Sequence, residues 1–148
     1  MKMCSSKTPL EVSCGILQLG DTILAVRRKQ GKILAGKYEF PGGKIEPGET
    51  PEGCLLRELQ EELNLKVDIL SSLPPVLHAY AHGLIRLHPF ICRPKNSVSL
   101  LKDHDHTLWD KPENLFNLPW AEADREVLQA YLTYTRTCSF GETLTRES

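Results

Sequence analysis

Apolar and polar residues alternate along several short segments of the chain, as they do in β-strands that bury one face. The turn-forming pair Gly20-Asp21 joins the first two segments into a predicted hairpin. The third segment follows a polar loop over residues 29–37 and ends at Pro41, because proline cannot donate a ladder hydrogen bond. Strands are predicted at residues 10–19, 22–28, 38–40, 66–73, 76–81, 84–92 and 105–109.

Two segments instead repeat apolar residues every three or four positions, which predicts helices over residues 51–63 and 122–134. Thr50 is a favourable N-cap, Pro51 suits the first helical position, and Asn64 tolerates the left-handed conformation that ends many helices. Four leucines of the first helix should pack on the core: Leu55, Leu56, Leu59 and Leu63. The apolar face of the second helix consists of Val127, Leu128, Tyr131 and Leu132.

This order of strands and helices predicts one α/β domain with layers packed on a mixed sheet. The 148 residues suit a single domain, with a core over about residues 10–133 and a loose polar tail from Thr135. Apolar residues make up 41% of the chain, which is enough for a hydrophobic core. The net charge of −1 argues against a nucleic-acid backbone as a stable partner.

Nothing in the sequence indicates export or membrane insertion. No apolar run approaches the length of a membrane span, and Met1 to Pro9 lacks the apolar stretch of a signal peptide. The five cysteines include no C-x-x-C pair, which argues against a zinc site or a disulfide framework and favours reduced thiols. We therefore expect a cytoplasmic protein that is a monomer or a homodimer.

The first predicted helix carries Glu58, Glu61 and Glu62 at positions i, i+3 and i+4. This spacing places three carboxylates on one side of the helix, where like charges repel by about 0.2–0.5 kcal/mol per pair. A hard divalent cation among them would remove that repulsion, and magnesium prefers oxygen ligands. The alternative is a solvated acidic face with Arg57 and Lys66 nearby.

The residues around this helix favour the metal site. The segment GKIEPGETPEGCLLRELQEELNL, residues 43–65, resembles the Nudix box, G-x5-E-x7-R-E-U-x-E-E-x-G-U, where U is a bulky apolar residue. The one departure is Asn64 in place of glycine, and asparagine is the next best residue for a left-handed helix end. The matching residues are Gly43, Glu49, Arg57, Glu58, Leu59, Glu61, Glu62 and Leu65.

The resemblance implies an α/β/α sandwich that hydrolyses a nucleoside diphosphate linked to another group, with Mg²⁺ or Mn²⁺ as cofactor. The implied metal ligands are the Gly42 carbonyl and the carboxylates of Glu58, Glu61 and Glu62. Arg57 would orient a glutamate, with Glu49 as the expected partner, rather than touch the substrate. Metal ions would screen the substrate's negative charge and lower the pKa of the attacking water.

The chain is similar in more detail to the MutT branch, which converts nucleoside triphosphates into monophosphates and pyrophosphate. Its best-known substrate is the oxidised nucleotide 8-oxo-dGTP, which such enzymes remove before it enters DNA. Arg28 lies fifteen residues before Gly43, the position of a nucleotide-binding arginine in MutT. The segment Glu39, Phe40 and Pro41 matches one that lines the MutT nucleotide pocket.

A catalytic carboxylate must also take a proton from the attacking water. Glu58 and Asp103 are both candidates for this base, and the sequence does not choose between them. Asp103 lies six residues before Trp109, where MutT has an acidic metal ligand, and here the side chain is shortened to aspartate.

Asp124 bears on which nucleobase the protein recognises. MutT reads the oxidised guanine with an asparagine near the start of the last helix, and Asp124 takes that position. An ionised aspartate only accepts hydrogen bonds, so it would favour a donor such as the cytosine amine unless it is protonated. The CTP pyrophosphohydrolases, which share this acidic residue and a pair like Asp103-His104, are therefore an alternative.

Other residues have plainer interpretations. Tyr80 is a candidate for stacking on the base, although strand tyrosines more often pack. His104 and His106 lack a third metal ligand in view. Trp109, Trp120 and Cys54 are expected to pack in or beside the core.

Together these features predict a magnesium-dependent nucleoside triphosphate pyrophosphohydrolase, with 8-oxo-dGTP as the leading substrate. The alternatives are a hydrolase of CTP or a modified pyrimidine nucleotide, an enzyme acting on the 5′ end of RNA, and a non-catalytic nucleotide sensor.

Overall fold

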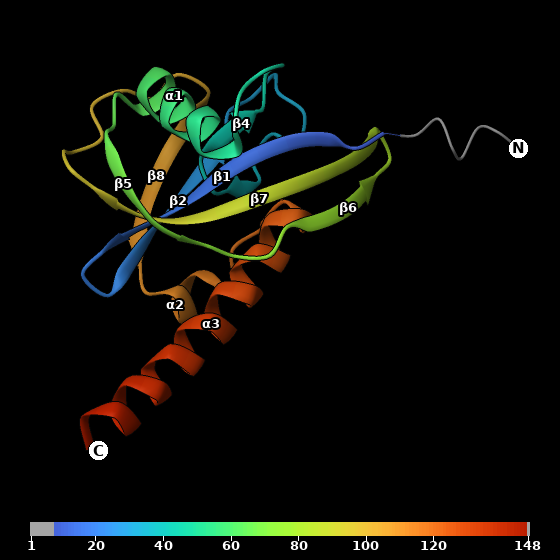
Figure 1. Ribbon diagram of the computed structural model, residues 1–148. Helices are drawn as coiled ribbons and strands as arrows, with labels where there is room; N and C mark the ends of the chain where they lie inside the picture. The colour runs from blue at the N-terminus through green and yellow to red at the C-terminus, as the bar shows by residue number, and fades with distance from the viewer. Residues whose placement is uncertain (1–7, 148) are drawn as a thin grey trace, which may run out of the picture.

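The computed structural model describes residues 8–147, and the side chains of residues 8–137. A mixed sheet lies between two helical layers (Figure 1). Helix α1 (Pro51–Leu63) covers one face, and α2 (Pro112–Leu115) and α3 (Glu122–Glu147) lie on the other. The predicted α/β/α sandwich is confirmed. The segment before Thr8, which carries the signal-peptide argument, and the side chain of Cys138 lie outside the described part.

Eight strands of the described chain form the sheet, with the order β3-β2-β1-β7-β5 along its main path. The pairing of β1 with β7 is parallel, and the other pairs are antiparallel. Three strands lie off the path: β4 pairs with β1, β6 with β7, and β8 with β2. The strands are β1 (Leu10–Leu19), β2 (Thr22–Arg28), β3 (Tyr38–Glu39), β4 (Gly42–Lys44), β5 (Val67–Ser72), β6 (Val76–Tyr80), β7 (Gly83–Pro94) and β8 (His104–Asp110).

All seven predicted strands are present, but β4 was not predicted because two glycines indicate a loop. Gly42 and Gly43 instead pair with Cys14 and Ser13 of β1. A Cβ on Gly42 would lie 1.9 Å from the Ser13 carbonyl oxygen, so only glycine permits this close approach of the two strands.

Helix α1 has the predicted bounds and caps. Thr50 Oγ1 accepts a hydrogen bond from the Gly53 N–H at 3.0 Å, and Asn64 is left-handed with φ 52°. Leu56, however, is 45% exposed, so its predicted place in the core is wrong. The helix is rotated about its axis so that the side bearing Cys54 and Glu58 faces the sheet, and at about 100° per residue this turns Leu56 outward.

Helix α3 begins at the predicted Glu122 but continues to Glu147, past the predicted end at Tyr134. The tail from Thr135 is therefore helical rather than loose. Polar contacts fix the start of α3 to β6: Tyr80 Oη accepts a hydrogen bond from the Ala123 N–H at 2.8 Å. The His78 ring lies between Glu122 and Glu126, at 2.7 and 2.8 Å. These contacts set the position of Asp124 against the sheet.

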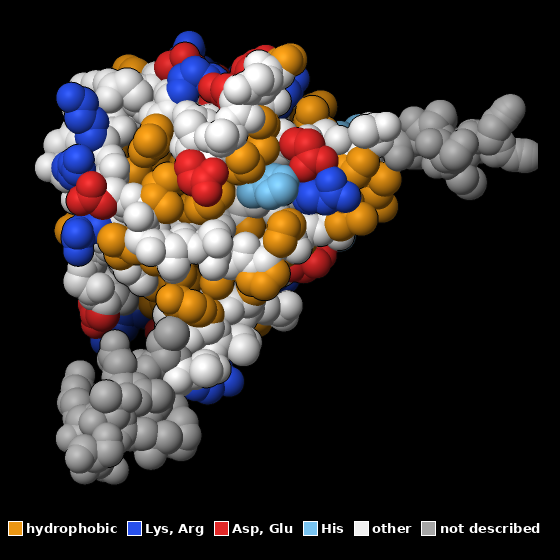
Figure 2. Space-filling model, in the orientation of Figure 1, with side chains coloured by type: hydrophobic (Ala, Val, Ile, Leu, Met, Phe, Trp, Pro, Cys, Tyr) orange, Lys and Arg blue, Asp and Glu red, His pale blue; other side chains and the backbone are white. Residues whose placement is uncertain are grey.

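Two apolar clusters hold the layers together, because alternate residues of β1 face opposite sides. Leu17 packs with Leu55 and Leu59 of α1, and Ile16 packs with Val127 of α3 and its neighbours. On the surface, apolar side chains form separate groups among polar and charged ones (Figure 2). In the described part of the chain, no helix is long and apolar enough to cross a membrane.

Candidate active site

A cavity of about 540 Å³ lies at the edge of the sheet, between the carboxylates of α1 and the start of α3. Twelve residues are predicted to act in catalysis or to bind the metal or the substrate. Nine of them line the cavity: Arg28, Glu39, Phe40, Gly42, Glu58, Glu62, Tyr80, Asp103 and Asp124. The other three, Arg57, Glu61 and Pro41, do not. Pro41 is buried, and its carbonyl accepts a hydrogen bond from the Gly15 N–H at 2.8 Å.

One end of the cavity is strongly acidic. Glu62 of α1 lies close to Glu58 of the same helix and to Asp103, which immediately precedes β8. Burial, followed by the negative charge of Glu58 and contact with Asp103, raises the pKa of Glu62 to about 9. Glu62 therefore holds a proton at neutral pH unless a positive charge arrives between these carboxylates.

Glu58 is pressed against the backbone of β4. A Cβ on Gly43 would lie 2.2–2.5 Å from the carboxylate atoms of Glu58, so glycine is required at this position. The side chain of Glu58 is only 14% exposed, whereas that of Glu61 is 52% exposed. The three box glutamates thus have unequal surroundings, which their spacing alone does not reveal.

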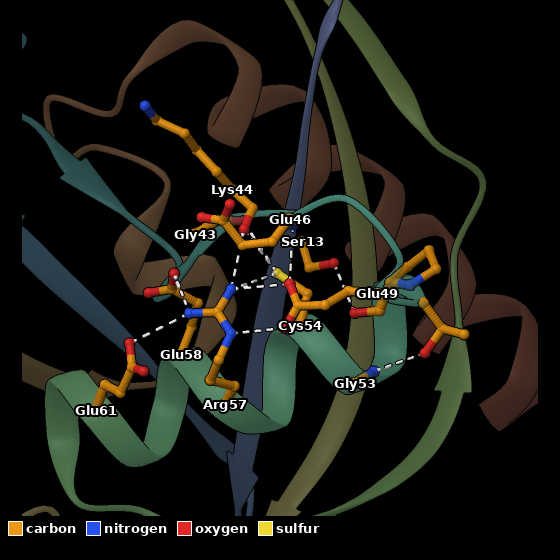
Figure 3. A network of polar contacts seen from close by, with 12 residues as sticks. Ser13, Gly43, Lys44, Glu46, Glu49, Gly53, Cys54, Arg57, Glu58 and Glu61 are labelled. Atoms are coloured by element: carbon orange, nitrogen blue, oxygen red, sulfur yellow. Dashed lines mark hydrogen bonds and ion pairs between the residues drawn. The ribbon is translucent and has the colours of Figure 1, made fainter.

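Arg57 organises the loop before α1 (Figure 3). Its guanidinium makes two hydrogen bonds to Glu49, with Nε 2.6 Å from Oε2 and Nη2 2.9 Å from Oε1. It also contacts Glu58 at 3.1 Å, Glu61 at 3.2 Å and the Lys44 carbonyl at 3.2 Å. This is the arrangement expected for an arginine that orients glutamates instead of touching substrate.

The oxygen atoms at the acidic end are suitable ligands for magnesium or manganese, because they belong to carboxylates and a backbone carbonyl. The raised pKa of Glu62 also reflects a crowding of negative charge that a divalent cation would relieve. Among the described residues, no three His, Cys, Asp or Glu side chains already form a metal-binding group. Glu61 is held by Arg57 at 3.2 Å, so it would have to leave Arg57 to join Glu58 and Glu62 around a metal ion.

Arg28, Glu39 and His104 form a linked group on three adjacent strands. Arg28 Nη1 lies 3.1 and 3.2 Å from the two Glu39 oxygens, and His104 Nε2 lies 2.8 Å from Glu39 Oε2. The His104 side chain is 2% exposed, and its buried Nδ1 has no hydrogen-bond partner among the residues that the structure describes. His106 is exposed and meets the edge of Tyr38 instead, so the two histidines do not converge.

At the other end of the cavity, apolar side chains surround the carboxyl group of Asp124. Asp124 is 6% exposed, and its Oδ2 accepts a hydrogen bond from the Phe40 N–H at 2.9 Å. Burial, with a contribution from the charge of Glu39, raises the pKa of Asp124 well above its usual range. In its protonated form this acid would carry an O–H donor as well as an acceptor oxygen.

The ring of Tyr80 also lines this apolar end, and it stacks on His82 with the centroids 5.0 Å apart. Phe40 packs on Trp120 at 4.8 Å, and Trp120 is buried as expected. Cys54 is buried too, with its thiol near the Gly43 and Lys44 carbonyls. Cys14, Cys54 and Cys92 are free thiols.

Sequence reasoning missed other residues that line the cavity, among them Lys32 and Lys44. Lys32 lies in the polar loop 29–37, where nothing distinguishes it from its neighbours. Its Nζ lies 3.1 Å from Asp103 Oδ1, a contact between residues 71 positions apart that only the fold reveals.

Comparison with known proteins is consistent with this geometry. Residues 7–131 match the family described as NUDIX domain. The chain is 29% identical over 123 residues to a CTP pyrophosphohydrolase of Escherichia coli, covering 83% of this chain and 91% of that protein. It is 36% identical over 86 residues to an 8-oxo-dGTP diphosphatase of Proteus vulgaris, covering 57% of this chain and 77% of the other.

Among solved structures, a MutT NUDIX hydrolase from Burkholderia pseudomallei superposes with a TM-score of 0.75 at 22% identity. The match covers 84% of this chain and 98% of that one, which supports the same fold.

Proposed function

This chain belongs to the Nudix family of hydrolases, and we propose that it hydrolyses nucleoside triphosphates to monophosphates and pyrophosphate. The preferred substrate in this proposal is 8-oxo-dGTP. The observation that carries the proposal is one cavity with the box carboxylates at one end and Asp124 at the other. A nucleotide spanning it would place its base near Asp124 and its phosphates near Glu58 and Glu62.

Nudix hydrolases generally use divalent metal ions. In this proposal Glu58, Glu61, Glu62 and the Gly42 carbonyl hold magnesium, which supplies charge neutralisation of the phosphates and a more acidic water. Arg57 and Glu49 fix the loop that positions these ligands. Both Glu58 and Asp103 stay candidates for the base that accepts the proton of water.

The raised pKa of Asp124, caused by burial and then by the charge of Glu39, supports the choice of an oxidised purine. With a proton on one oxygen, Asp124 donates to an acceptor, while Oδ2 accepts from Phe40 and has a second lone pair. The edge of 8-oxoguanine offers an acceptor, O6, beside a donor, N7–H, so it complements both groups. Unoxidised guanine has acceptors at both positions and loses one contact.

The second candidate is CTP, favoured by the relative named for that activity, which matches over most of its length. If Asp124 ionises in the complex, it accepts from the cytosine amine instead. Asparagine cannot ionise, so the two functions predict opposite results for Asp124→Asn.

The test is a panel of canonical and oxidised nucleotides with Mg²⁺, with products identified by mass. We expect monophosphate and pyrophosphate, and a higher kcat/KM for 8-oxo-dGTP than for dGTP or CTP. Asp124→Asn should keep that preference, and Asp124→Ala should reduce it about tenfold or more, the effect of one lost hydrogen bond of about 1.5 kcal/mol. A preference for CTP that disappears in Asp124→Asn would support the second candidate.

A separate variant tests catalysis itself. Glu62→Gln should lower kcat by at least about a hundredfold, because the amide cannot supply an anionic oxygen to a metal ion. Undiminished turnover in this variant, or no hydrolysis of any nucleotide by the unaltered protein, would contradict the proposed function.

A further inference from the structure

The loop of residues 29–37, between β2 and β3, brings a cation to the acidic end of the cavity. Lys32 lines the cavity, and its Nζ lies 3.1 Å from Asp103 Oδ1. We propose that Lys32 binds the terminal phosphate of the substrate, exchanging its partner Asp103 for a phosphate oxygen. The proposal rests on the proposed function, because it takes a nucleoside triphosphate as the substrate.

The position of Lys32 indicates which part of a nucleotide it would meet. Asp103 faces Glu62, so Lys32 lies at the acidic end. Asp124, Phe40 and the ring of Tyr80 lie where the base is expected. A nucleotide held in this direction extends its phosphates toward Lys32, and the phosphate farthest from the base comes nearest.

The charges of the cavity also single out this lysine. Besides two histidines, its lining has several carboxylates and three Lys or Arg side chains, Arg28, Lys32 and Lys44. Arg28 is engaged by Glu39 at two points and by the Ile33 carbonyl. Lys32 has one ion pair and a side chain that is 40% exposed, so it can change partner at little cost. Lys44 is also exposed, but it belongs to β4 and not to the loop that brings Lys32 to Asp103.

The loop itself is held in place, so the exchange requires only a side-chain rotation. Backbone hydrogen bonds close its base, from Arg28 N–H to the Lys37 carbonyl and from Gly36 N–H to the Arg28 carbonyl, both 2.9 Å. Lys29 Nζ adds a 2.7 Å hydrogen bond to the Lys102 carbonyl. Leu34 has φ 64°, a conformation that leucine rarely adopts and that persists only when surrounding contacts enforce it.

The exchange keeps one charge-assisted hydrogen bond for Lys32 and leaves the Asp103 carboxylate without its cation. The exchange would leave the Asp103 carboxylate beside Glu62, which is where a candidate base or metal ligand is needed.

The test compares Lys32→Met with Lys37→Met. Lys37 belongs to the same loop and is exposed, but it does not line the cavity, so its variant removes an equal charge nearby. Affinities are measured by calorimetry with Mg²⁺ for a triphosphate analogue with a non-hydrolysable α,β-bridge and for the corresponding monophosphate. Lys32→Met should weaken triphosphate binding about tenfold and leave monophosphate binding unchanged.

Lys32→Arg should keep triphosphate affinity within about threefold, because it retains the charge. In turnover, Lys32→Met should raise KM with kcat nearly unchanged, since the contact is made in both ground and transition states. Unchanged triphosphate affinity in Lys32→Met, an equal loss for the monophosphate, or an equal loss in Lys37→Met would overturn the proposal. If the unaltered protein hydrolyses no triphosphate, the proposed function fails, while the binding comparison still tests Lys32.

Discussion

The guanidinium of Arg57 holds the carboxylate of Glu49 at two points, with N–O distances of 2.6 and 2.9 Å. Hydrogen bonds from Arg57, followed by one from the Glu46 N–H, lower the pKa of Glu49 to about 2. Arg57 comes from the middle of α1 and Glu49 from the loop before it. The pair therefore fixes the loop between β4, which carries Gly42 and Gly43, and the helix that carries Glu58.

Arg57→Lys tests this positioning role. Lysine keeps the charge but cannot reproduce two parallel hydrogen bonds, so the loop and Glu58 should lose their fixed relation. We expect kcat to fall about tenfold to a hundredfold with KM within about threefold. Glu52→Gln, an exposed substitution in the first turn of α1, is the control and should leave both constants unchanged. A change in KM alone would indicate that Arg57 contacts the substrate instead.

Gly43→Ala tests the contact between β4 and Glu58. The added methyl would lie 2.2–2.5 Å from the Glu58 carboxylate and must displace it. Turnover should fall at least about tenfold, because small misplacements of catalytic groups cost this much or more. Gly53→Ala is the matched control: its Cβ meets only Thr50 Oγ1, at 3.1 Å, and alanine is the better helix former. Equal activity of the two variants in a steady-state assay would refute the steric argument.

The sequence predicts the fold well because its strongest signals are local. Alternation, the Gly20-Asp21 turn and the caps at Thr50 and Asn64 act over a few residues, and all appear where expected. Leu56 shows the limit of such signals. Helical spacing groups it with the buried leucines, but the rotation of α1 that brings Glu58 to the cavity is set by packing across the sheet.

The same limit applies to the site. The box motif identifies Glu58 and Glu62, which line the cavity, but it cannot show that Glu61 turns to Arg57 instead. Lys32 escapes notice because its partner Asp103 is distant in the sequence. The sequence also does not show the raised pKa of Asp124, because this shift depends on burial and on Glu39, which only the fold provides.

The stability of Asp124→Asn tests the raised pKa of Asp124. The pKa of Asp124 is raised in the folded state above its unfolded value near 3.8, so the unfolded chain loses the proton first. The free energy of unfolding of the unaltered protein therefore falls as pH rises above about 3.8, toward the folded-state pKa. Asparagine does not titrate and can still accept from the Phe40 N–H.

We therefore expect Asp124→Asn to gain thermal stability over the unaltered protein as pH increases from 4 to 8. A relative rise in Tm of about 2–4 °C, which corresponds to about 1 kcal/mol in a domain of this size, would suffice. Differential scanning fluorimetry across the pH range provides the measurement. A difference in Tm that stays constant with pH would show that Asp124 is ionised in the folded protein.

Magnesium should bind more tightly as pH rises, because Glu62 must lose its proton to become a ligand. Its pKa of about 9 predicts a gain in metal affinity approaching tenfold per pH unit from pH 6 to 8 and a smaller gain above that. The Mg²⁺-induced rise in Tm should grow accordingly, and a chelator should abolish it.

Calorimetry in two buffers of different ionisation enthalpy should show proton release on Mg²⁺ binding. Glu62→Gln has no proton to lose, so its weaker binding should depend much less on pH. Proton uptake, or a pH dependence that Glu62→Gln retains in full, would contradict the assignment of Glu62 as the group that magnesium deprotonates.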